Sequence, residues 1–265
     1  MIWGSWKIIA CVGSLSMLLS ADVSGCTKSA SIDGNVAHTT QLSLEQLHHQ
    51  AQGITVKVMS TEFLGSGIIL GKQGTVYTVL TNAHVLRAGK SPYRIQTVDG
   101  RTHPANLLPK VRFGKHDLAL LQFQSIGNDY RVAALGYSPT EGDEVFATGF
   151  PFDQEELVDK GFTFTKGKVL LVLHKALEGG YQLGYTNELA KGMSGGPLLN
   201  RRGEVVGING MHAYPLWDAP SVFIDGLQAE ENLHQKIIRL SWAVPIDKVV
   251  RMMPANSSPQ LRQTD

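Results

Sequence analysis

The sequence predicts an all-β protein. Glycine accounts for 28 of the 265 residues, and glycines interrupt the apolar runs along the whole chain, as is typical of proteins with many turns. Short runs of apolar and β-branched residues alternate with turn-forming segments such as Asp99-Gly100 and Glu141-Gly142-Asp143. Because no helix-length segments separate these runs, the pattern favours a barrel or a sandwich over an α/β fold.

The first 25 residues are typical of an export signal. Lys7 precedes an apolar run, residues 8–21, that is too short to span a membrane, and small residues follow it. Residues 1–25 are therefore predicted to be a signal peptide, which would place the protein in the periplasm or outside the cell. Cys26 lies where a bacterial lipoprotein signal would attach a lipid and so fix the protein to a membrane, although Asp22 is unusual beside such a site. Cleavage without lipidation is the alternative.

A polar tether and a short helix come before the strands. Residues 26–42 are small and polar without apolar periodicity, and we expect them to be flexible. Ser43 and Gln46 have the spacing of a capping box and are expected to begin a helix that ends near Gln52. The predicted strands are then Ile54–Met59, Phe63–Leu70, Thr75–Thr81, Tyr93–Val98, Leu118–Phe123, Glu144–Thr148, Lys166–Leu173, Gly180–Thr186, Pro197–Asn200 and Glu204–Asn209.

Helical signals return only near the C-terminus. The segment Ala229–Leu240 has Leu233 and Ile237 on one face, and Pro245 is expected to begin a second helix that runs to about Met253. Residues 255–265 form a polar tail.

The composition limits the class of protein. The 24 Lys and Arg residues nearly balance the 23 Asp and Glu residues, which gives a net charge of +1. Since nucleic-acid binders carry a marked positive charge, no nucleic-acid partner is expected. No cofactor is expected either, because the sequence has no His-Glu-x-x-His motif and no pair of cysteines at the spacing of metal ligands. Cys11 lies in the predicted signal peptide, so no disulfide within the chain would remain, and an exported domain without disulfides points to a bacterial protein.

The most informative segment is Gly192-Met193-Ser194-Gly195-Gly196-Pro197. Glycines permit backbone conformations closed to other residues, so such a loop can expose two amide hydrogens. If the N–H groups of Gly192 and Ser194 point the same way, they form an oxyanion hole beside the Ser194 hydroxyl. An ordinary turn between two strands is the alternative.

A nucleophilic serine needs a base, and a carboxylate that holds this base. Among nine histidines, His84 follows a predicted strand, where the strand end would fix the ring on a rigid support. Asp117 opens the apolar run 118–121, and a carboxylate at the edge of a core needs a partner such as an imidazole N–H. The adjacent His116 would face the opposite way.

Four motifs occur together in the order and approximate spacing of the chymotrypsin-fold serine proteases. They are Gly65-Ser66-Gly67-Ile68, the segment 79–85 that ends Asn82-Ala83-His84-Val85, the segment 116–121, and the segment 192–197. From about residue 53 to 253 the chain resembles the bacterial trypsin-like peptidases related to the high-temperature-requirement proteases.

This resemblance implies two six-stranded antiparallel β-barrels, with the first helix and first barrel in residues 43–134 and the second barrel in residues 135–254. Residues 213–240 would form an insertion near the rim of the cleft. The resemblance also implies a serine endopeptidase that acts through an acyl-enzyme on extended or unfolded polypeptides, with His84 and Asp117 on the first barrel and Ser194 on the second. The oligomeric state is not predicted.

The chain departs from this pattern in two places. Met193 stands where digestive relatives have an aspartate that pairs with a newly cut N-terminus, so activation by cleavage is not expected. Eleven residues follow Pro254, and we expect no PDZ module after the last helix.

Specificity and substrate binding rest on four further residues. Glu188 lies six residues before Ser194, the offset at which trypsin-like proteases hold the acid of the S1 pocket, and it would favour Lys or Arg at P1. A solvent-facing Glu188 is the alternative, since the stress-protease relatives often prefer small aliphatic P1 residues. Asn209, Gly210 and Met211 would lie on the strand that pairs with the extended substrate.

Two other functions fit parts of the sequence. An α/β-hydrolase esterase would use Ser194 with Asp218 or Asp225 and His234, but Pro197 leaves almost no room for the helix that must follow its serine. A protease-like domain with an idle site could serve as a peptide-binding or chaperone module. Nothing in the sequence favours this second function, because all three triad residue types are present.

Overall fold

A computed structural model describes residues 41–60, 63–108, 111–153, 158–214 and 220–253. The predicted signal peptide, Cys26, most of the tether, Asp218 and the polar tail lie outside the described residues. Helix α1 (Leu44–Ile54) begins with the predicted capping box, in which Ser43 and Gln46 bond each other's backbone. The helix ends two residues beyond its predicted end, because Ile54 lies on the same buried apolar face as Leu47.

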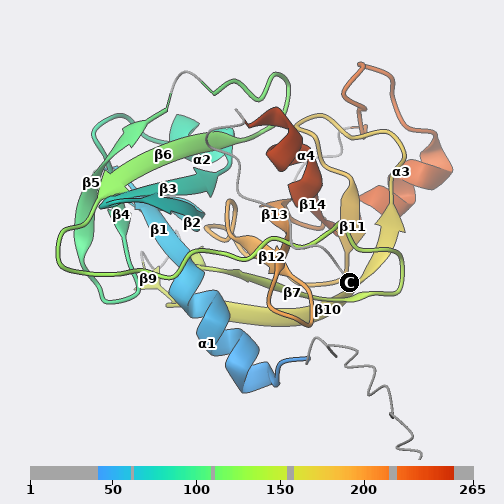
Figure 1. Cartoon of the computed structure of the whole chain (residues 1–265). Helices are drawn as coiled ribbons and strands as arrows, with labels where there is room; N and C mark the ends of the chain where they lie inside the picture. The colour runs from blue at the N-terminus through green and yellow to red at the C-terminus, as the bar shows by residue number, and fades with distance from the viewer. Residues whose placement is uncertain (1–40, 61–62, 109–110, 154–157, 215–219, 254–265) are drawn as a thin grey trace, which may run out of the picture. The chain divides into compact units, whose positions relative to one another are not determined.

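The first closed barrel is antiparallel and contains six strands in the order β1-β2-β3-β6-β5-β4 (Figure 1). Its strands are β1 (Thr55–Met59), β2 (Phe63–Gln73), β3 (Val76–Thr81), β4 (Tyr93–Gln96), β5 (Thr102–Leu107) and β6 (Ala119–Gln124).

The second closed barrel, also antiparallel, has the order β10-β11-β14-β13-β12-β7. Its strands are β7 (Glu144–Gly149), β10 (Thr163–Val172), β11 (Leu183–Tyr185), β12 (Pro197–Leu199), β13 (Val205–Met211) and β14 (Ser241–Pro245), and a small separate sheet pairs β8 (Phe152–Asp153) with β9 (Val158–Asp159). The predicted all-β fold with two six-stranded barrels is confirmed.

One strand of the first barrel was absent from the sequence prediction. Strand β5 contains Pro104, and Ala105 is its one buried residue, so it shows neither an apolar run nor a clear alternation. It forms because its backbone pairs with β4 on one side and β6 on the other. Hydrogen bonds to its two neighbouring strands therefore stabilise β5, although its own sequence does not predict a strand.

Three further helices are short. Helix α2 (Ala83–Arg87) follows β3, α3 (Glu231–Ile237) lies within the predicted insertion, and α4 (Ile246–Met252) follows Pro245 as predicted. Helix α3 is shorter than the predicted 229–240, because the chain turns after Ile237 and enters β14 at Ser241. Within the described part of the chain, none of the helices is long and apolar enough to cross a membrane.

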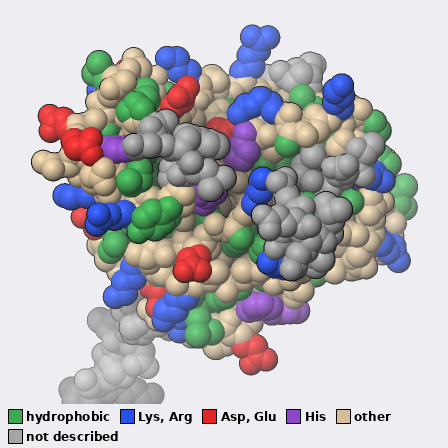
Figure 2. Space-filling model, turned by 180° about the vertical axis from the view of Figure 1, so that it is seen from behind, with side chains coloured by type: hydrophobic (Ala, Val, Ile, Leu, Met, Phe, Trp, Pro, Cys, Tyr) green, Lys and Arg blue, Asp and Glu red, His purple; other side chains and the backbone are tan. Residues whose placement is uncertain are grey.

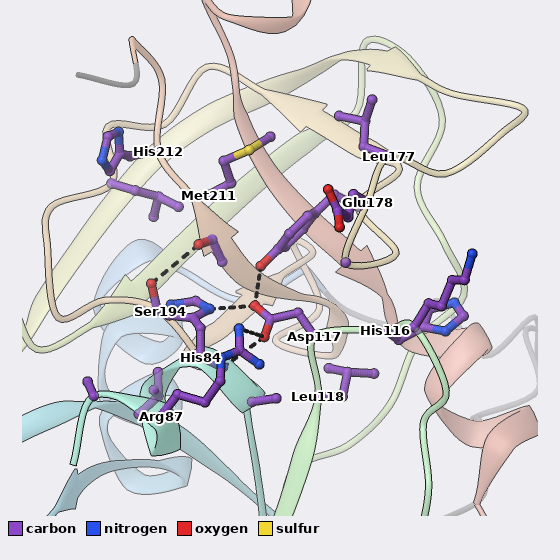
Figure 3. A pocket seen from close by; sticks show the side chains of 18 of the residues that line it. His84, Arg87, His116, Asp117, Leu118, Leu177, Glu178, Ser194, Met211 and His212 are labelled. Atoms are coloured by element: carbon purple, nitrogen blue, oxygen red, sulfur yellow. Dashed lines mark hydrogen bonds and ion pairs between the residues drawn. The ribbon is translucent and has the colours of Figure 1, made fainter. Parts of the chain in front are cut away.

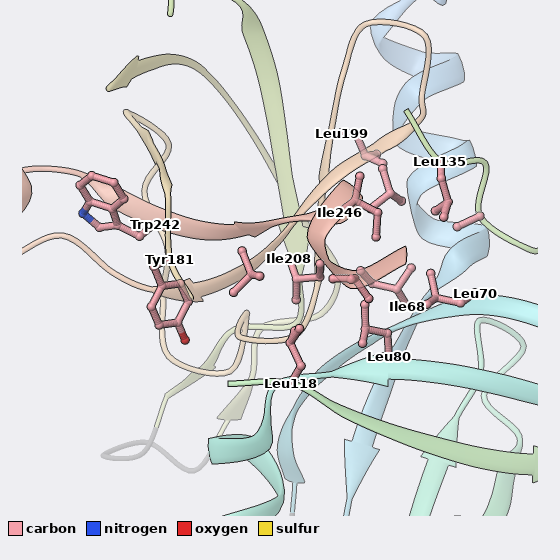
Figure 4. Close-up of a cluster of buried hydrophobic side chains, with 14 of the residues drawn as sticks. Ile68, Leu70, Leu80, Leu118, Leu135, Tyr181, Leu199, Ile208, Trp242 and Ile246 are labelled. Atoms are coloured by element: carbon pink, nitrogen blue, oxygen red, sulfur yellow. The ribbon is translucent and has the colours of Figure 1, made fainter. Parts of the chain in front are cut away.

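A hydrophobic cluster joins the two barrels. Successive side chains of a strand point to opposite faces, so Val79 of β3 packs inside the first barrel while Leu80 packs outside it. There Leu80 shares one buried cluster with residues of the second barrel, such as Ile208 (Figure 4). Full burial of one such side chain contributes about 1.5–3 kcal/mol, so the cluster holds the barrels in a fixed relation and fixes the cleft between them.

The surface reflects the balanced composition. On the face shown in Figure 2, the described Lys and Arg side chains are scattered among acidic and other residues.

Candidate active site

A cleft of about 1620 Å³ lies between the two barrels (Figure 3). Residues of both barrels line it, from α2 and the start of the β6 segment on one side and from the loop before β12 and the end of β13 on the other. Six of the residues singled out in the sequence line this cleft, namely His84, Asp117, Gly192, Ser194, Gly210 and Met211.

His84 and Asp117 are in direct contact. Nδ1 of His84 contacts the Oδ2 oxygen of Asp117, and the backbone N–H of His84 donates to Oδ1 at 2.8 Å. Asn82, the residue before α2, donates its side-chain N–H to the Asp117 carbonyl oxygen at 2.8 Å. The carboxylate is therefore bound by both the ring and the backbone of His84, which fixes the orientation of the imidazole.

The surroundings of Asp117 keep its carboxyl group ionised. Burial alone would raise the pKa, but hydrogen bonds from His84 and Tyr181, together with the charge of His84, outweigh it and hold the pKa of Asp117 below its ordinary value. The Tyr181 hydroxyl donates to Oδ2 at 2.7 Å, and Nη2 of Arg87 lies 3.5 Å from Oδ1. An ionised Asp117 can hold a proton on Nδ1 of His84, which leaves Nε2 free to accept another.

The loop that carries Ser194 is fastened to both barrels. Ser66 of β2 donates its backbone N–H to the Ser194 carbonyl at 2.9 Å, and its hydroxyl donates to the Gly192 carbonyl at 2.8 Å. From the second barrel, the Asn209 carbonyl accepts the N–H of Gly195 at 2.8 Å. The position of Ser194 thus depends on strands of both barrels.

Glycine is required at the turn after Ser194. Gly195 has φ of +85°, a conformation that L side chains rarely adopt. A Cβ atom there would lie 2.2 Å from the Ser66 carbonyl oxygen.

Two amides beside the serine have no hydrogen-bond acceptor within the described parts of the chain. They are the N–H groups of Gly192 and Ser194, the two named in the sequence analysis. Between them, the peptide plane that joins Gly192 and Met193 is bonded at both ends, to the Ser66 hydroxyl and to the Ala190 carbonyl. Gly192 has φ of +95°, which explains the glycine at this position.

The Ser194 hydroxyl donates to the Gly210 carbonyl oxygen at 3.4 Å. Among the described residues no hydrogen bond joins it to His84, although both side chains line the same cleft (Figure 3). Catalytic hydrogen bonds are often long or poorly aligned before substrate binds, so this geometry is compatible with a nucleophilic Ser194.

Two predicted substrate-binding residues lie elsewhere. Glu188 is exposed and does not line the cleft, whereas its neighbours Leu189 and Ala190 do. The side chain of Asn209 is fully buried, where it donates to the carbonyls of Thr148 and Pro197 at 3.1 Å. Asn209 therefore supports the Ser194 loop from inside the second barrel.

The described residues of the esterase alternative, Asp225 and His234, bond other side chains. His234 bonds the Ser221 hydroxyl at 2.9 Å, and Asp225 pairs with Lys175 at 2.6 Å. Strand β12 begins at Pro197, so no helix follows Ser194. Because the fold is two antiparallel barrels, the α/β-hydrolase interpretation is wrong.

Two residues at the site were not assigned a role from the sequence. Ser66 lies within one of the four motifs, but its hydroxyl bonds a loop 126 residues further on. Tyr181 is 64 residues from Asp117. It lies in the segment 180–186, for which the sequence predicted a strand and no role at the site. Among the described residues, no group of three or more His, Cys, Asp and Glu side chains is placed to hold a metal ion.

Comparisons with known proteins agree with this geometry. Residues 65–208 match the model of the trypsin-like peptidase domain. The chain is 34% identical over 157 residues to serine protease HTRA1 of Xenopus laevis, which covers 55% of this chain and 30% of that protein. It is 37% identical over 149 residues to a probable periplasmic serine endoprotease DegP-like of Hahella chejuensis, covering 55% and 29%.

A third relative is the periplasmic pH-dependent serine endoprotease DegQ of Escherichia coli, at 34% identity over 149 residues, covering 56% of this chain and 31% of that protein. The chain thus spans about a third of the length of these relatives. Among solved structures, the serine endoprotease from Yersinia pestis shares the fold, with a TM-score of 0.56, 23% identity, and coverage of 80% of this chain and 65% of that one. Since the domain model matches more than half of its residues, the chain belongs to the trypsin-like peptidase domain family.

Proposed function

We propose that the chain is an exported serine endopeptidase in which Ser194, His84 and Asp117 form the catalytic triad. The observation that carries this proposal is the contact between His84 and Asp117 in a cleft that Ser194 also lines. The free N–H groups of Gly192 and Ser194, on a loop fixed by both barrels, supply the other part that acyl transfer needs.

The proposed reaction proceeds in two acyl transfers. The Ser194 hydroxyl attacks the peptide carbonyl carbon while His84 Nε2 takes its proton, and the Gly192 and Ser194 amides hold the negatively charged oxygen. The C–N bond then breaks, and His84 gives the proton to the leaving amine. Water attacks the acyl-enzyme in the same way, which releases the carboxylic acid and restores Ser194. Asp117 holds the ring throughout and stabilises its protonated form.

The substrate class that fits is an extended polypeptide. The pairing register of β13 with β14 shifts between Asn209 and Met211, so Gly210 lies outside the regular ladder next to Ser194. An extended substrate could add its backbone along this edge.

Where residues 189–191 line the cleft, its wall favours an uncharged P1 residue over Lys or Arg, although Glu178 also lines the cleft. It carries Leu189 and Ala190 rather than Glu188, and the exposed residue Lys191 also lines it. A cationic P1 side chain would meet no carboxylate from Glu188 there.

Export is proposed from the predicted signal peptide together with the relatives whose names call them periplasmic. Lipidation of Cys26 remains a separate proposal. If the wild type is found in the membrane fraction and Cys26→Ser is found in the soluble fraction, the result supports lipidation. A wild type that is already found in the soluble fraction would contradict it.

A fluorophosphonate probe tests the proposed activity. The wild type should be labelled, and Ser194→Ala should not. Ser194→Ala and His84→Ala should each lower turnover of an unfolded protein substrate by about a million-fold, by analogy with triad deletions in other serine proteases. A folded wild type that takes up no probe would favour the idle peptide-binding module, and variants that keep turnover within tenfold of the wild type would contradict the triad.

A further inference from the structure

Tyr181 connects the second barrel to Asp117. It lies between a tight turn at residues 177–180 and strand β11, and the Leu177 N–H donates to its carbonyl at 2.9 Å. Its side chain is 7% exposed and packs in the hydrophobic cluster between the barrels (Figure 4). Its hydroxyl leaves this cluster and donates to Oδ2 of Asp117 at 2.7 Å.

The same carboxylate oxygen serves His84. Oδ2 of Asp117 contacts Nδ1 of His84 and accepts the Tyr181 hydroxyl, while Oδ1 accepts the His84 backbone N–H. The imidazole and the phenol therefore compete for the electron density of one oxygen. Without the phenol, Oδ2 would be held by the imidazole alone.

Packing leaves the phenol ring little freedom. A Cβ atom on Gly210 would lie 2.4 Å from the Tyr181 hydroxyl oxygen, so the ring fits closely against the strand that borders Ser194. The backbone of the same turn also binds the aspartate, because the Asp117 N–H donates to the Gly179 carbonyl at 2.8 Å.

Within the described part of the chain, three side chains pair with the carboxylate, and Lys115, Glu178, Lys191 and His212 line the same cleft. His84 and Arg87 face the carboxylate from α2, and Tyr181 faces it from the second barrel. The neighbouring His116 bonds the Phe113 carbonyl at 3.0 Å. Burial and the charge of Asp117 raise the pKa of Tyr181 well above its ordinary value, so the phenol stays protonated and acts as a donor.

We propose that Tyr181 is a positioning residue of the triad, which fixes the Asp117 carboxylate and moderates how strongly it holds the protonated His84. This inference deepens the proposed function and rests on it. A hydrogen bond to a buried charge is among the strongest single polar interactions in proteins. Its loss removes one of the bonds that hold the Asp117 carboxylate, and the charge on Oδ2 then acts on the imidazole alone.

The test is the pH dependence of kcat/KM for Tyr181→Phe with a peptide substrate. The plateau should fall about tenfold, as expected for the loss of one hydrogen bond to a charged group. The acidic limb, which reports protonation of the catalytic base, should move to higher pH, because an Asp117 without the phenol stabilises the imidazolium more strongly. A residue with a merely structural role would not move this limb.

A second substitution covers the case in which Tyr181→Phe does not fold. Incorporation of 3-fluorotyrosine at position 181 keeps the shape and makes the hydroxyl a stronger donor. The acidic limb should then move to lower pH, opposite to the effect of phenylalanine. A limb that stays in place with the fluorinated residue would overturn the proposal.

Tyr77→Phe is the matched control. Like Tyr181, Tyr77 is buried and its hydroxyl donates to a carboxylate, that of Asp129 at 2.8 Å, but it lies in the core of the first barrel. This variant should be less stable than the wild type, but its pH profile of kcat/KM should keep the same plateau and the same acidic and basic limbs. A folded Tyr181→Phe that behaves the same way would overturn the positioning role alone. A wild type without turnover would overturn the proposed function, and this inference with it.

Discussion

Replacing Ser66 by alanine tests whether the first barrel holds the nucleophile loop in its working shape. The Ser66 hydroxyl is fully buried, donates to the Gly192 carbonyl at 2.8 Å, and accepts the Phe150 N–H at 2.9 Å. The substitution removes both bonds and adds no bulk. A buried carbonyl and a buried N–H are then left without this partner.

The expected magnitudes follow from these two bonds. A buried polar group without a partner costs about 1–3 kcal/mol, so the loss of partner for two such groups should lower the free energy of unfolding by roughly 2–6 kcal/mol. A domain with a stability of about 10 kcal/mol stays folded after this loss. The N–H of Met193 still bonds the Ala190 carbonyl at 3.1 Å, so the peptide plane after Gly192 keeps one anchor. We therefore expect kcat/KM to fall between about fivefold, the value of one hydrogen bond, and about a hundredfold, the lower value for loss of a whole oxyanion donor.

The assay compares peptide hydrolysis and thermal unfolding of Ser66→Ala with those of Ser60→Ala. Ser60 is also buried, and its hydroxyl donates to the Lys90 carbonyl at 2.6 Å, away from the cleft. Ser60→Ala should lose stability but keep kcat/KM. If Ser66→Ala also loses only stability, with kcat/KM within twofold of Ser60→Ala, the claim that Ser66 shapes the loop is refuted.

Three further predictions concern charge, specificity and the backbone. The pKa of Asp117 lies below its ordinary 3.8, so its stabilising contribution is complete above that pH and is lost as the pH falls through the lower folded value. Melting temperatures of the wild type and Asp117→Asn should thus converge below pH 3.8, and a constant difference would contradict this. Glu188→Gln should leave the P1 profile in a positional-scanning library of peptides unchanged, and a loss of Lys or Arg acceptance would restore Glu188 as the S1 acid. Gly195→Ala should destabilise by at least about 2 kcal/mol, since its Cβ would lie 2.2 Å from a carbonyl oxygen. Gly71→Ala, with open space around it, should be nearly neutral in the same unfolding measurement, and equal losses would argue against the steric reasoning.

The candidate triad was accessible from sequence because its signals are local. The glycines around Ser194 indicate a backbone conformation that favours glycine. The structure shows this conformation, with φ of +95° at Gly192 and +85° at Gly195. His84 and Asp117 each stand at the end of a strong apolar strand signal, so their supports could be predicted even though their contact could not. Recognising the motifs in order supplied the topology, which no single run of residues contains.

The remaining parts of the site depend on contacts between distant segments. Tyr181 lies in the segment 180–186, whose sequence predicts only a strand. No neighbouring residue in the sequence indicates that its hydroxyl bonds a carboxylate 64 residues away. The position of Glu188 was inferred from its offset to Ser194, but an offset does not determine which way a side chain turns. Here Glu188 faces solvent while the next residues line the cleft. Side-chain direction in an irregular loop is set by packing, which a local pattern does not encode.

The hydrogen bonds that shape this site cross from one barrel to the other. Ser66 of the first barrel holds the carbonyls of Gly192 and Ser194, and Tyr181 of the second barrel holds the carboxylate of Asp117. Each barrel therefore depends on the other to position the triad residues that it carries. A perturbation that separates the barrels slightly should loosen the nucleophile loop and Asp117 together, before either barrel unfolds. Activity should then be lost at a lower denaturant concentration than the β-sheet signal in far-ultraviolet circular dichroism, which persists while each barrel stays folded. Coincident transitions would instead mean that the barrels and their interface unfold as one cooperative unit.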